Sequence, residues 1–394
     1  MNVPIPEEWM DTNEFVRHIR EDLHQIPELG LDLPMTRAYI CKELDKLGIP
    51  YKLNEKDSGL VATICGNKDG KVLAFRSDMD ALPMGEETGL PFSSHHPGVM
   101  HSCGHDAHAA MLLGTARILK AHEKEIPGTV KLIFQSAEEI AKGAKAMIAA
   151  GALHDPEVDA IYGLHIASIP NANLPTGTLL VTPGCAMVSY DRFILDIKGR
   201  GCHGAIPEKG IDPIMIGSNI VMALQEIIAR ETGATIPAVV TIGSFVGGDT
   251  FNIIPDSAHI EGTIRAVEEA DRQRIVKRIE EISTSIAAAY RGTCTMTMDW
   301  GAPPVVNDEK MVEIAQEAGR EVLGTENVAT KAALNMGGED FAYYLLEKPG
   351  AYMFVVTNSE YPQHNPRYEF ERGLLWRGPA MFTTITKKFF GINW

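Results

Sequence analysis

Short apolar runs alternate with segments of helical periodicity between residues 60 and 165 of the chain. The apolar runs cover residues 60–65, 72–75, 130–134 and 160–164, and the helical segments cover residues 107–121 and 139–150. Short apolar runs separated by helices are typical of strands that are buried on both faces of a parallel sheet. The alternation therefore predicts an α/β fold with a mixed, mainly parallel sheet flanked by helices.

The pattern changes after residue 186 and resumes near residue 300. Between these points we expect strand, helix, strand, strand, helix and strand, at residues 192–198, 212–231, 238–245, 259–267, 271–290 and 293–299. This order is that of a ferredoxin-like split β-α-β unit. The sequence therefore predicts a discontinuous larger domain, residues 1–186 and 300–394, and an inserted α+β domain, residues 187–299.

Charge and cysteine usage limit the partners and the compartment. The chain has 36 Lys and Arg against 52 Asp and Glu, a formal net charge of −16. A field of this sign repels polyanions and anionic lipid, so neither nucleic acid nor a membrane is an expected partner. The six cysteines include no Cys-x-x-Cys pair. Free thiols suit a reducing compartment, and we expect a cytoplasmic protein.

Groups that can bind a metal follow three of the apolar runs. Asp78 and Asp80 follow the second run, Glu138 and Glu139 follow the third, and His165 follows the fourth. In open α/β sheets, ligands bind outside the carboxyl ends of the strands. Parallel strands would therefore bring these side chains together at one edge of the sheet.

Further ligands precede the helix expected at residues 107–121. Cys103 and His105 flank Gly104, so both side chains can face one centre, and Asp106 can cap the helix. Carboxylate, imidazole and thiolate together suit Zn²⁺ or a neighbouring transition metal better than Mg²⁺ or Ca²⁺. Because more ligands are present than one tetrahedral catalytic ion uses, a pair of ions is indicated.

Each of these groups taken alone has a structural explanation. A free cysteine is usually a small hydrophobic residue, adjacent glutamates often begin a helix, and a single histidine can be a hydrogen-bonded core residue. Their joint placement at strand ends favours a metal centre instead. In such a centre one carboxylate of the Glu138 and Glu139 pair can bind metal while the other stays free to act as a base.

A series of motifs runs along nearly the whole chain: LHQIPE at residues 23–28, RSDMDALP at 76–83, HSCGHD at 101–106, FQSAEE at 134–139, GLH at 163–165 and GEDF at 338–341. In this order they resemble the amidohydrolase branch of the M20 metallopeptidase family. That branch includes hippurate hydrolases, N-acyl-amino-acid amidohydrolases, N-acetyl-diaminopimelate deacetylases and auxin-conjugate hydrolases.

The resemblance implies a site with two divalent metal ions, zinc or manganese, with cobalt or nickel as alternatives. The implied ligands are Cys103, His105, Glu139, His165 and His364. Cys103 would stand where other branches of the family place a metal-bridging aspartate. Glu138 would be the general base, which takes a proton from the attacking water and later gives it to the leaving amine.

The same resemblance assigns roles in the inserted domain, which would act as a lid and a dimerisation domain. His203 would help to hold the oxyanion, often from the partner subunit, and Asn252 and Arg265 would line the carboxylate side of the substrate. Asp78 and Asp80 would orient the metal ligands from behind them. A homodimer or a higher homo-oligomer formed through the inserted domain is expected.

The sequence thus predicts a metal-dependent amidohydrolase that cleaves an N-acyl amino acid to a carboxylic acid and a free amino acid, by attack of a metal-bridged hydroxide. A dipeptidase or aminopeptidase using the same site is the nearest alternative. A cysteine hydrolase with Cys103 as nucleophile and a metal-dependent binding protein without turnover are two others. No organic cofactor is expected.

Overall fold

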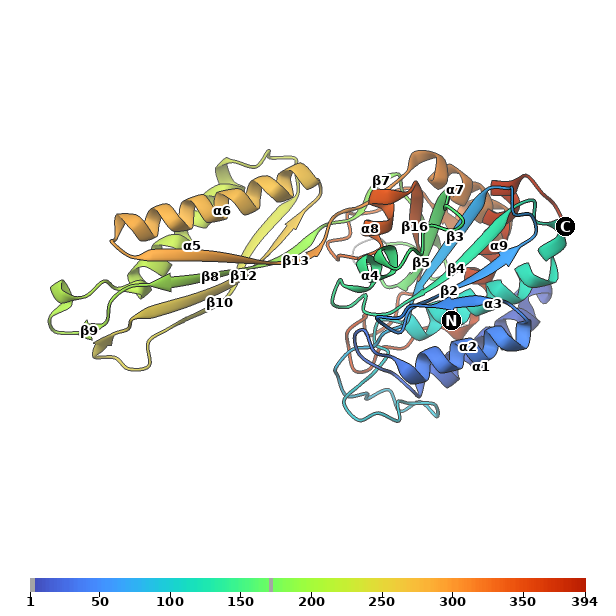
Figure 1. The fold of residues 1–394 in the computed structure, drawn as a ribbon, viewed down its shortest axis with the longest axis horizontal. Helices are drawn as coiled ribbons and strands as arrows, with labels where there is room; N and C mark the ends of the chain where they lie inside the picture. Colours follow the sequence, from blue (N-terminus) through green and yellow to red (C-terminus); the bar gives the residue numbers. More distant parts are fainter. Residues whose placement is uncertain (1–3, 170–172) are drawn as a thin grey trace. The chain divides into compact units, whose positions relative to one another are not determined.

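The chain folds into two compact units, and the computed structural model describes residues 4–169 and 173–394 of them (Figure 1). Unit 1 comprises Met1–Ala186, Val305–Asn335 and Glu339–Trp394, and unit 2 comprises Met187–Pro304 and Met336–Gly338. The predicted insert, residues 187–299, begins where unit 2 begins and ends inside the last strand of that unit.

The centre of unit 1 is an eight-stranded sheet in the order β1-β2-β4-β3-β5-β16-β6-β15. Its central strands are parallel and fully buried, namely β4 (Thr129–Gln135), β3 (Val72–Asp78), β5 (Ala160–Ala167) and β16 (Gly350–Val356). Short strands complete the two edges: β1 (Tyr51–Leu53) and β2 (Leu60–Cys65) on one side, β6 (Leu179–Leu180) and β15 (Val328–Ala329) on the other. The predicted mixed, mainly parallel sheet is confirmed.

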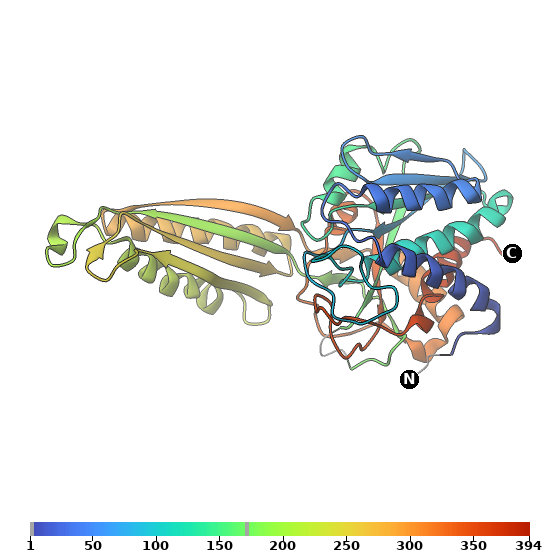
Figure 2. The ribbon, with the colours of Figure 1, turned by 90° about the horizontal axis from the view of Figure 1, so that it is seen from below.

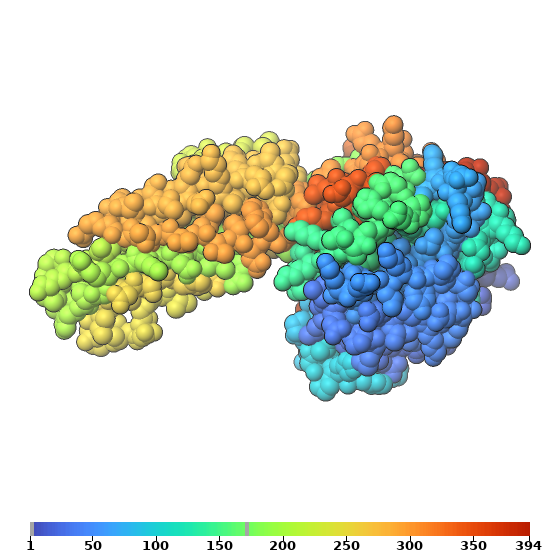
Figure 3. Space-filling view, in the orientation of Figure 1, coloured from blue at the N-terminus to red at the C-terminus, as the bar shows by residue number. Residues whose placement is uncertain are grey.

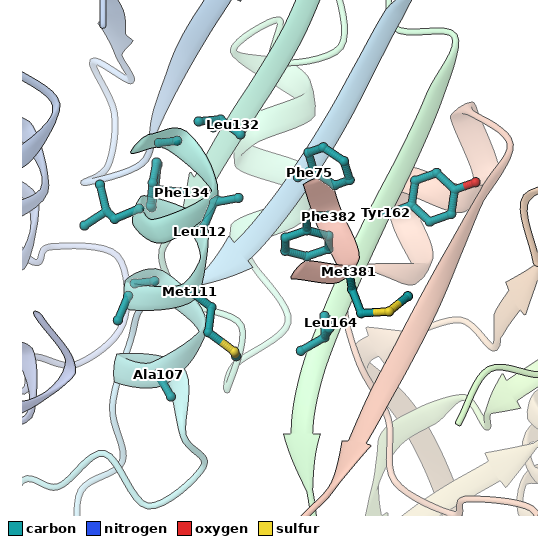
Figure 4. Packing of buried hydrophobic residues seen from close by; sticks show 14 of the residues in the cluster. Phe75, Ala107, Met111, Leu112, Leu132, Phe134, Tyr162, Leu164, Met381 and Phe382 are labelled. Atoms are coloured by element: carbon teal, nitrogen blue, oxygen red, sulfur yellow. The ribbon is translucent and has the colours of Figure 1, made fainter. Parts of the chain in front are cut away.

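Helices cover both faces of this sheet. On one face lie α1 (Met10–His24), α2 (Pro34–Leu47), α3 (His105–Ala121), α7 (Glu309–Leu323) and α9 (Arg377–Phe390). Figure 4 shows Phe75 of β3 beside Phe382 of α9, with their ring centroids 4.5 Å apart. The shorter helices α4 (Gly143–Ala149) and α8 (Ala342–Glu347) contact β4 and β16. Burial on both faces explains why these strands read as continuous apolar runs.

Helix α4 is shorter than the predicted helix over residues 139–150. It begins at Gly143, because Ala137 and Ala141 have positive φ angles of 56° and 52°. Residues in that left-handed region cannot continue a right-handed helix. Residues 138–142 therefore form a turn at the end of β4. The prediction that His165 follows its strand is also wrong by a few residues, since β5 continues to Ala167.

Unit 2 is a four-stranded antiparallel sheet with two helices on one face (Figure 2). The chain runs through β8 (Tyr190–Lys198), α5 (Pro213–Arg230), β10 (Ala238–Gly247), β12 (Ser257–Ala266), α6 (Glu269–Ala289) and β13 (Thr293–Ala302). The strand order β10-β12-β8-β13 is the ferredoxin-like arrangement that was predicted. Ile275 and Ile279 of α6 are fully buried in the core of this unit.

Two short strands, β9 (Cys202–His203) and β11 (Ile253–Ile254), pair with each other in unit 2. In Figure 1 they lie at the end of unit 2 where β12 starts, whereas the chain enters and leaves the unit at the other end. Within residues 4–169 and 173–394, no helix combines the length and the apolar composition that crossing a membrane requires.

Candidate metal centre

Metal-binding side chains gather at the carboxyl ends of β3, β4 and β5. Their ligand atoms form overlapping groups in which all atoms lie within 4.8 Å of one another: Cys103 with His105 and His165, Cys103 with Glu139 and His364, and His105 with Glu138 and Glu139. We call the five predicted ligands among them, Cys103, His105, Glu139, His165 and His364, the metal centre. The structure therefore brings together all of the ligands that the resemblance implied.

Cys103 and His105 reach this edge from a long connection between β3 and α3. In the space-filling view this connection lies at the surface of unit 1 (cyan in Figure 3). Gly104 separates the two ligands with a φ angle of 95°, and α3 begins directly after it. A Cβ atom at Gly104 would lie 3.0 Å from Cγ2 of Ile166. Glycine thus permits both the turn and the close approach to β5.

Asp106 does not cap α3, contrary to the prediction. Its carboxylate is buried and accepts hydrogen bonds from Nε of Arg20, at 3.0 Å, and Nδ1 of His24, at 2.7 Å. Arg20 and His24 belong to α1, so the charge of Asp106 is used between helices rather than at a helix end. This network ties the start of α3, and with it His105, to α1.

The hydrogen bonds of two histidines fix which ring nitrogen faces the centre. Nδ1 of His105 lies 2.9 Å from the carbonyl oxygen of Asp80, and Nδ1 of His165 lies 2.9 Å from that of Ile166. Because a carbonyl oxygen only accepts, both protons sit on Nδ1 and each Nε2 keeps its lone pair for a metal. Nε2 of His165 is 3.4 Å from Sγ of Cys103.

Asp80 orders the turn that carries the two glutamates. Its Oδ1 accepts a hydrogen bond of 3.0 Å from the backbone N–H of Glu138, and its Oδ2 accepts one of 3.1 Å from that of Glu139. Oε2 of Glu138 and Oε1 of Glu139 then lie 3.8 and 3.9 Å from Nε2 of His105. Asp80 thus contacts His105, Glu138 and Glu139 through hydrogen bonds, and its role in orienting metal ligands stays a prediction.

Asp78 makes the second set of supporting contacts. Its Oδ2 accepts from Nη1 of Arg76 at 2.7 Å, and its Oδ1 accepts from Nδ1 of His108 at 2.6 Å. His108 in turn accepts a hydrogen bond of 2.9 Å from the backbone N–H of Ile166 through Nε2. Each oxygen of the Asp78 carboxylate therefore accepts a hydrogen bond from a buried side chain.

His364 joins the centre from a loop after β16. Its backbone N–H donates to the carbonyl oxygen of Ser102 at 2.9 Å, and its φ angle is 64°. Nε2 lies 3.6 Å from Oε2 of Glu139. Its side chain is more than half exposed. Unaided sequence reading favours a loop histidine here, and only the family resemblance indicated a ligand.

The charges at the centre favour a bound cation. Burial raises the pKa of the Cys103 thiol well above its usual range, and Glu139 adds to that rise. Burial also raises the pKa of the Glu139 carboxyl to about 7. Among the described residues, the buried Nε2 of His105 and Oε1 of Glu139 have no hydrogen-bond partner. Divalent cations would satisfy these atoms and offset the repulsion, and the thiolate, imidazole and carboxylate donors fit transition metals.

Sequence reasoning gave no role to His108 or Glu339. His108 follows His105 by three residues on one face of α3, which is the signal that could have found it. Glu339 is buried, and its carboxylate groups with those of Glu138 and Asp340. Arg76 pairs with Glu339 at 3.0 Å and with Asp340 at 2.8 Å. Arg76 lies in the motif RSDMDALP and Glu339 lies in GEDF, but neither motif alone predicts that the two residues form a buried ion pair.

The predicted substrate residues of the insert all belong to unit 2. Register pairs His203 with Ile253, and Gly204 donates to the carbonyl oxygen of Asn252 at 2.8 Å, so His203 and Asn252 are neighbours. Arg265 lies at the other end of β12, where its guanidinium is 5.5 Å from the ring of Tyr190. The structure therefore brings two of these three residues together and separates the third from them.

The chain matches known proteins over most of its length. Residues 74–387 match the sequence model of Peptidase family M20/M25/M40. N-acetyl-L-cysteine deacetylase of Bacillus subtilis (strain 168) is 37% identical over 375 residues, which cover 95% of this chain and 88% of the relative. IAA-amino acid hydrolase ILR1-like 4 of Arabidopsis thaliana is 37% identical over 382 residues, with 94% and 84% covered. The crystal structure of the Bacillus subtilis YXEP protein, a dinuclear metal binding peptidase from the M20 family, superposes with a TM-score of 0.83 at 34% identity. The match covers 97% of this chain and 99% of that one.

Proposed function

The chain belongs to peptidase family M20/M25/M40 and is a hydrolase of amide bonds, and from this premise we propose that it cleaves N-acyl amino acids. Water would split the amide into a carboxylic acid and a free amino acid. The names of a deacetylase and an amino acid hydrolase among its relatives support a small N-acyl amino acid as substrate. The cytoplasmic location stays part of the proposal, and the free state of all six cysteines supports it.

The observation that carries this proposal is the placement of Glu138 and Glu139 on the two oxygens of Asp80. Adjacent residues on one turn cannot both take the same position, so one carboxylate is available to bind metal and the other to move protons. We assign two divalent ions, zinc or manganese with cobalt or nickel as alternatives, to Cys103, His105, Glu139, His165 and His364. When bound, these ions would polarise the amide carbonyl and make a water molecule nucleophilic near neutral pH.

Glu138 is the proposed general base. Burial and the neighbouring charge of Glu339 raise the pKa of its carboxyl well above the usual range, and such a carboxyl holds a proton readily. As the water oxygen bonds to the acyl carbon, Glu138 accepts the water proton. It then donates that proton to the amide nitrogen as the carbon–nitrogen bond breaks.

The length of unit 2 supports a role for a partner subunit. His203 and Asn252 lie beyond Ser257, at the start of β12, and Arg265 lies eight residues further on. At about 3.3 Å per residue, eight residues of strand span about 26 Å between Ser257 and Arg265. One copy of unit 2 therefore cannot present Arg265 together with His203 and Asn252 to one small substrate. We therefore propose that the three residues do not serve a single site, and we assign His203 and Asn252 to the site of a partner in a homodimer.

The sharpest test of the substrate class varies only the acyl side. Acetyl, benzoyl and glycyl conjugates of one amino acid are incubated with purified protein and Mn²⁺ or Zn²⁺, and the free amino acid is measured. We expect release from the acetyl or the benzoyl conjugate. Efficient release from the glycyl conjugate alone would support the dipeptidase alternative, and binding without any release would support the metal-dependent binding protein.

A further inference from the structure

A pocket of about 400 Å³ lies beside the metal centre in unit 1. We propose that it binds the acyl group of the substrate and makes the enzyme prefer acyl groups larger than acetyl. This inference rests on the proposed function and specifies it further. The pocket, called the acyl pocket below, is lined mainly by apolar side chains, among them Ile169, Leu180, Ala333, Leu334 and Phe354.

Two residues that line the acyl pocket, Phe354 and Ile169, are neighbours of His165 in the metal centre. Phe354 is the register partner of His165 on the neighbouring strand, and their ring centroids are 6.5 Å apart. Ile169 follows His165 by four residues. The residue before it, Ser168, donates its backbone N–H to Oε1 of Gln363 at 3.2 Å, next to His364. This proximity supports the proposal that a group attached to a carbon atom at the metal centre reaches the pocket.

The order of the strands decides which half of the substrate lies there. Glu138 follows β4, whereas the acyl pocket lies at β16 and β6, and β3 and β5 run between them. Because Glu138 gives its proton to the leaving nitrogen, the amino acid half must lie on the β4 side. The acyl substituent, on the other side of the same carbonyl carbon, then points towards β16 and the pocket.

Size and chemistry define the class of acyl group. One water molecule takes about 30 Å³ of the liquid, and the methyl of an acetyl group is of similar size. An acetyl group would therefore leave most of the acyl pocket to water, in contact with Leu180, Leu334 and Phe354. A branched, aromatic or longer aliphatic acyl group would displace that water. Each methylene buried is worth about fourfold in kcat/KM.

The test compares acetyl, butyryl and benzoyl conjugates of one amino acid with the Mn²⁺-loaded enzyme. The two extra methylenes of butyrate predict a butyryl to acetyl ratio of kcat/KM of about 15. Ala333→Trp fills the pocket from an exposed position, and Leu334→Asp puts a charge into it. We expect each variant to lower the ratio to about 3 or less, and to lower benzoyl hydrolysis more than acetyl hydrolysis.

Ala149→Trp is the matched control, because Ala149 is an exposed alanine of α4 that lines no part of the pocket. It should leave all rates unchanged. A wild-type ratio near one, or equal losses on all conjugates in both pocket variants, would overturn the acyl pocket while leaving the proposed function standing. The acyl pocket would also be overturned if the two pocket variants changed only the preference for the amino acid, measured with one acyl group on different amino acids, and not the preference for the acyl group. No release from any conjugate would contradict the proposed function itself.

Discussion

The carboxylate of Asp80 accepts hydrogen bonds from the backbone N–H groups of Glu138 and Glu139. The two glutamate side chains therefore stay free for different roles. Both carboxylates approach Nε2 of His105, but each of them has a second neighbour of its own. Glu139 reaches Nε2 of His364, 3.6 Å away, while the Glu138 carboxylate also groups with Glu339. One turn can thus carry both the proposed metal ligand and the proposed base.

Glu138→Gln should therefore keep the metal and lose turnover. Glutamine has the same shape but cannot accept the proton of the attacking water, and general acid–base catalysis is worth about 10²–10⁴-fold. We expect kcat to fall by about 10³-fold with two metal ions per subunit still bound, measured by atomic spectroscopy. Glu139→Gln is the matched control and should lose metal instead. Wild-type turnover in the Glu138 variant would remove this residue from its proposed role.

Metal affinity should rise with pH around neutrality. Burial raises the pKa of Glu139 to about 7 in the metal-free protein, so below that pH the carboxyl is protonated and a metal ion must displace the proton. Affinity is then lost as pH falls through 7 and regained as it rises, about tenfold per pH unit for each proton released. Calorimetric titration with Zn²⁺ at pH 6 and 8, in two buffers with different heats of ionisation, measures the metal affinity and the number of protons released. An affinity independent of pH, without proton release, would contradict the assignment of Glu139.

At the scale of single elements, the start of α3 depends on one glycine. Gly104 has a φ angle of 95°, and a Cβ atom there would press on Ile166 of β5. Gly104→Ala should lower the free energy of unfolding by about 1–2 kcal/mol through backbone strain and reduce metal occupancy, because Cys103 and His105 flank it.

Thermal unfolding and metal analysis of the Gly104 variant measure these effects. Gly85→Ala is its control: the φ angle of Gly85 is not left-handed, and no atom beyond its chain neighbours lies within 4 Å of the added Cβ, so a change below about 0.5 kcal/mol is expected. Equal behaviour of the two variants would show that the turn tolerates a side chain.

Local patterns predicted most elements, and long-range contacts account for the rest. The helices expected at residues 107–121, 212–231 and 271–290 form with ends shifted by one or two residues, since their apolar faces are periodic. Residues 139–150 are rich in alanine, so propensity favours a helix throughout. The backbone N–H of Glu139 instead donates a hydrogen bond to Asp80, 59 residues earlier in the chain, and the residues before Gly143 form a turn and not the first turn of the helix.

The candidate site divides in the same way. Glu139 and His165 could be predicted to lie together because strand ends of a parallel sheet meet at one edge, and Cys103 and His105 could be predicted to face one centre because they flank Gly104 before a helix. His364 could not be derived from its own surroundings, since a backbone hydrogen bond to Ser102 brings it to the site. The buried pair of Arg76 and Glu339 joins segments more than 260 residues apart, and no local pattern reports such a contact.

At the scale of the whole molecule, the net charge of −16 opposes an anionic substrate. An N-acyl amino acid carries a carboxylate, which the overall field repels. The proposed function therefore requires local positive charge, which two divalent ions and Arg265 would supply. Net charge argues against nucleic acid as a partner, but it does not report the sign of a small substrate.

A homodimer with shared sites predicts complementation. Glu138→Gln and His203→Ala, each inactive alone, are co-expressed with different tags so that mixed dimers form. If His203 acts in the partner's site, each mixed dimer has one intact site, and random mixing restores about a quarter of wild-type activity. If His203 acted within its own subunit, no mixed site would be intact and activity would stay at the level of the separate variants.

The central claim is that bound metal and Glu138 carry out amide hydrolysis, and one measurement tests it most directly. The protein is stripped with EDTA, the chelator is removed, and hydrolysis of acetyl and benzoyl amino acids is followed as Mn²⁺, Zn²⁺ or Co²⁺ is added back with the bound metal counted. We predict no activity in the stripped protein and recovery as the bound metal approaches two ions per subunit. Full activity in metal-free protein, abolished by Cys103→Ala, would contradict this account and establish a cysteine hydrolase.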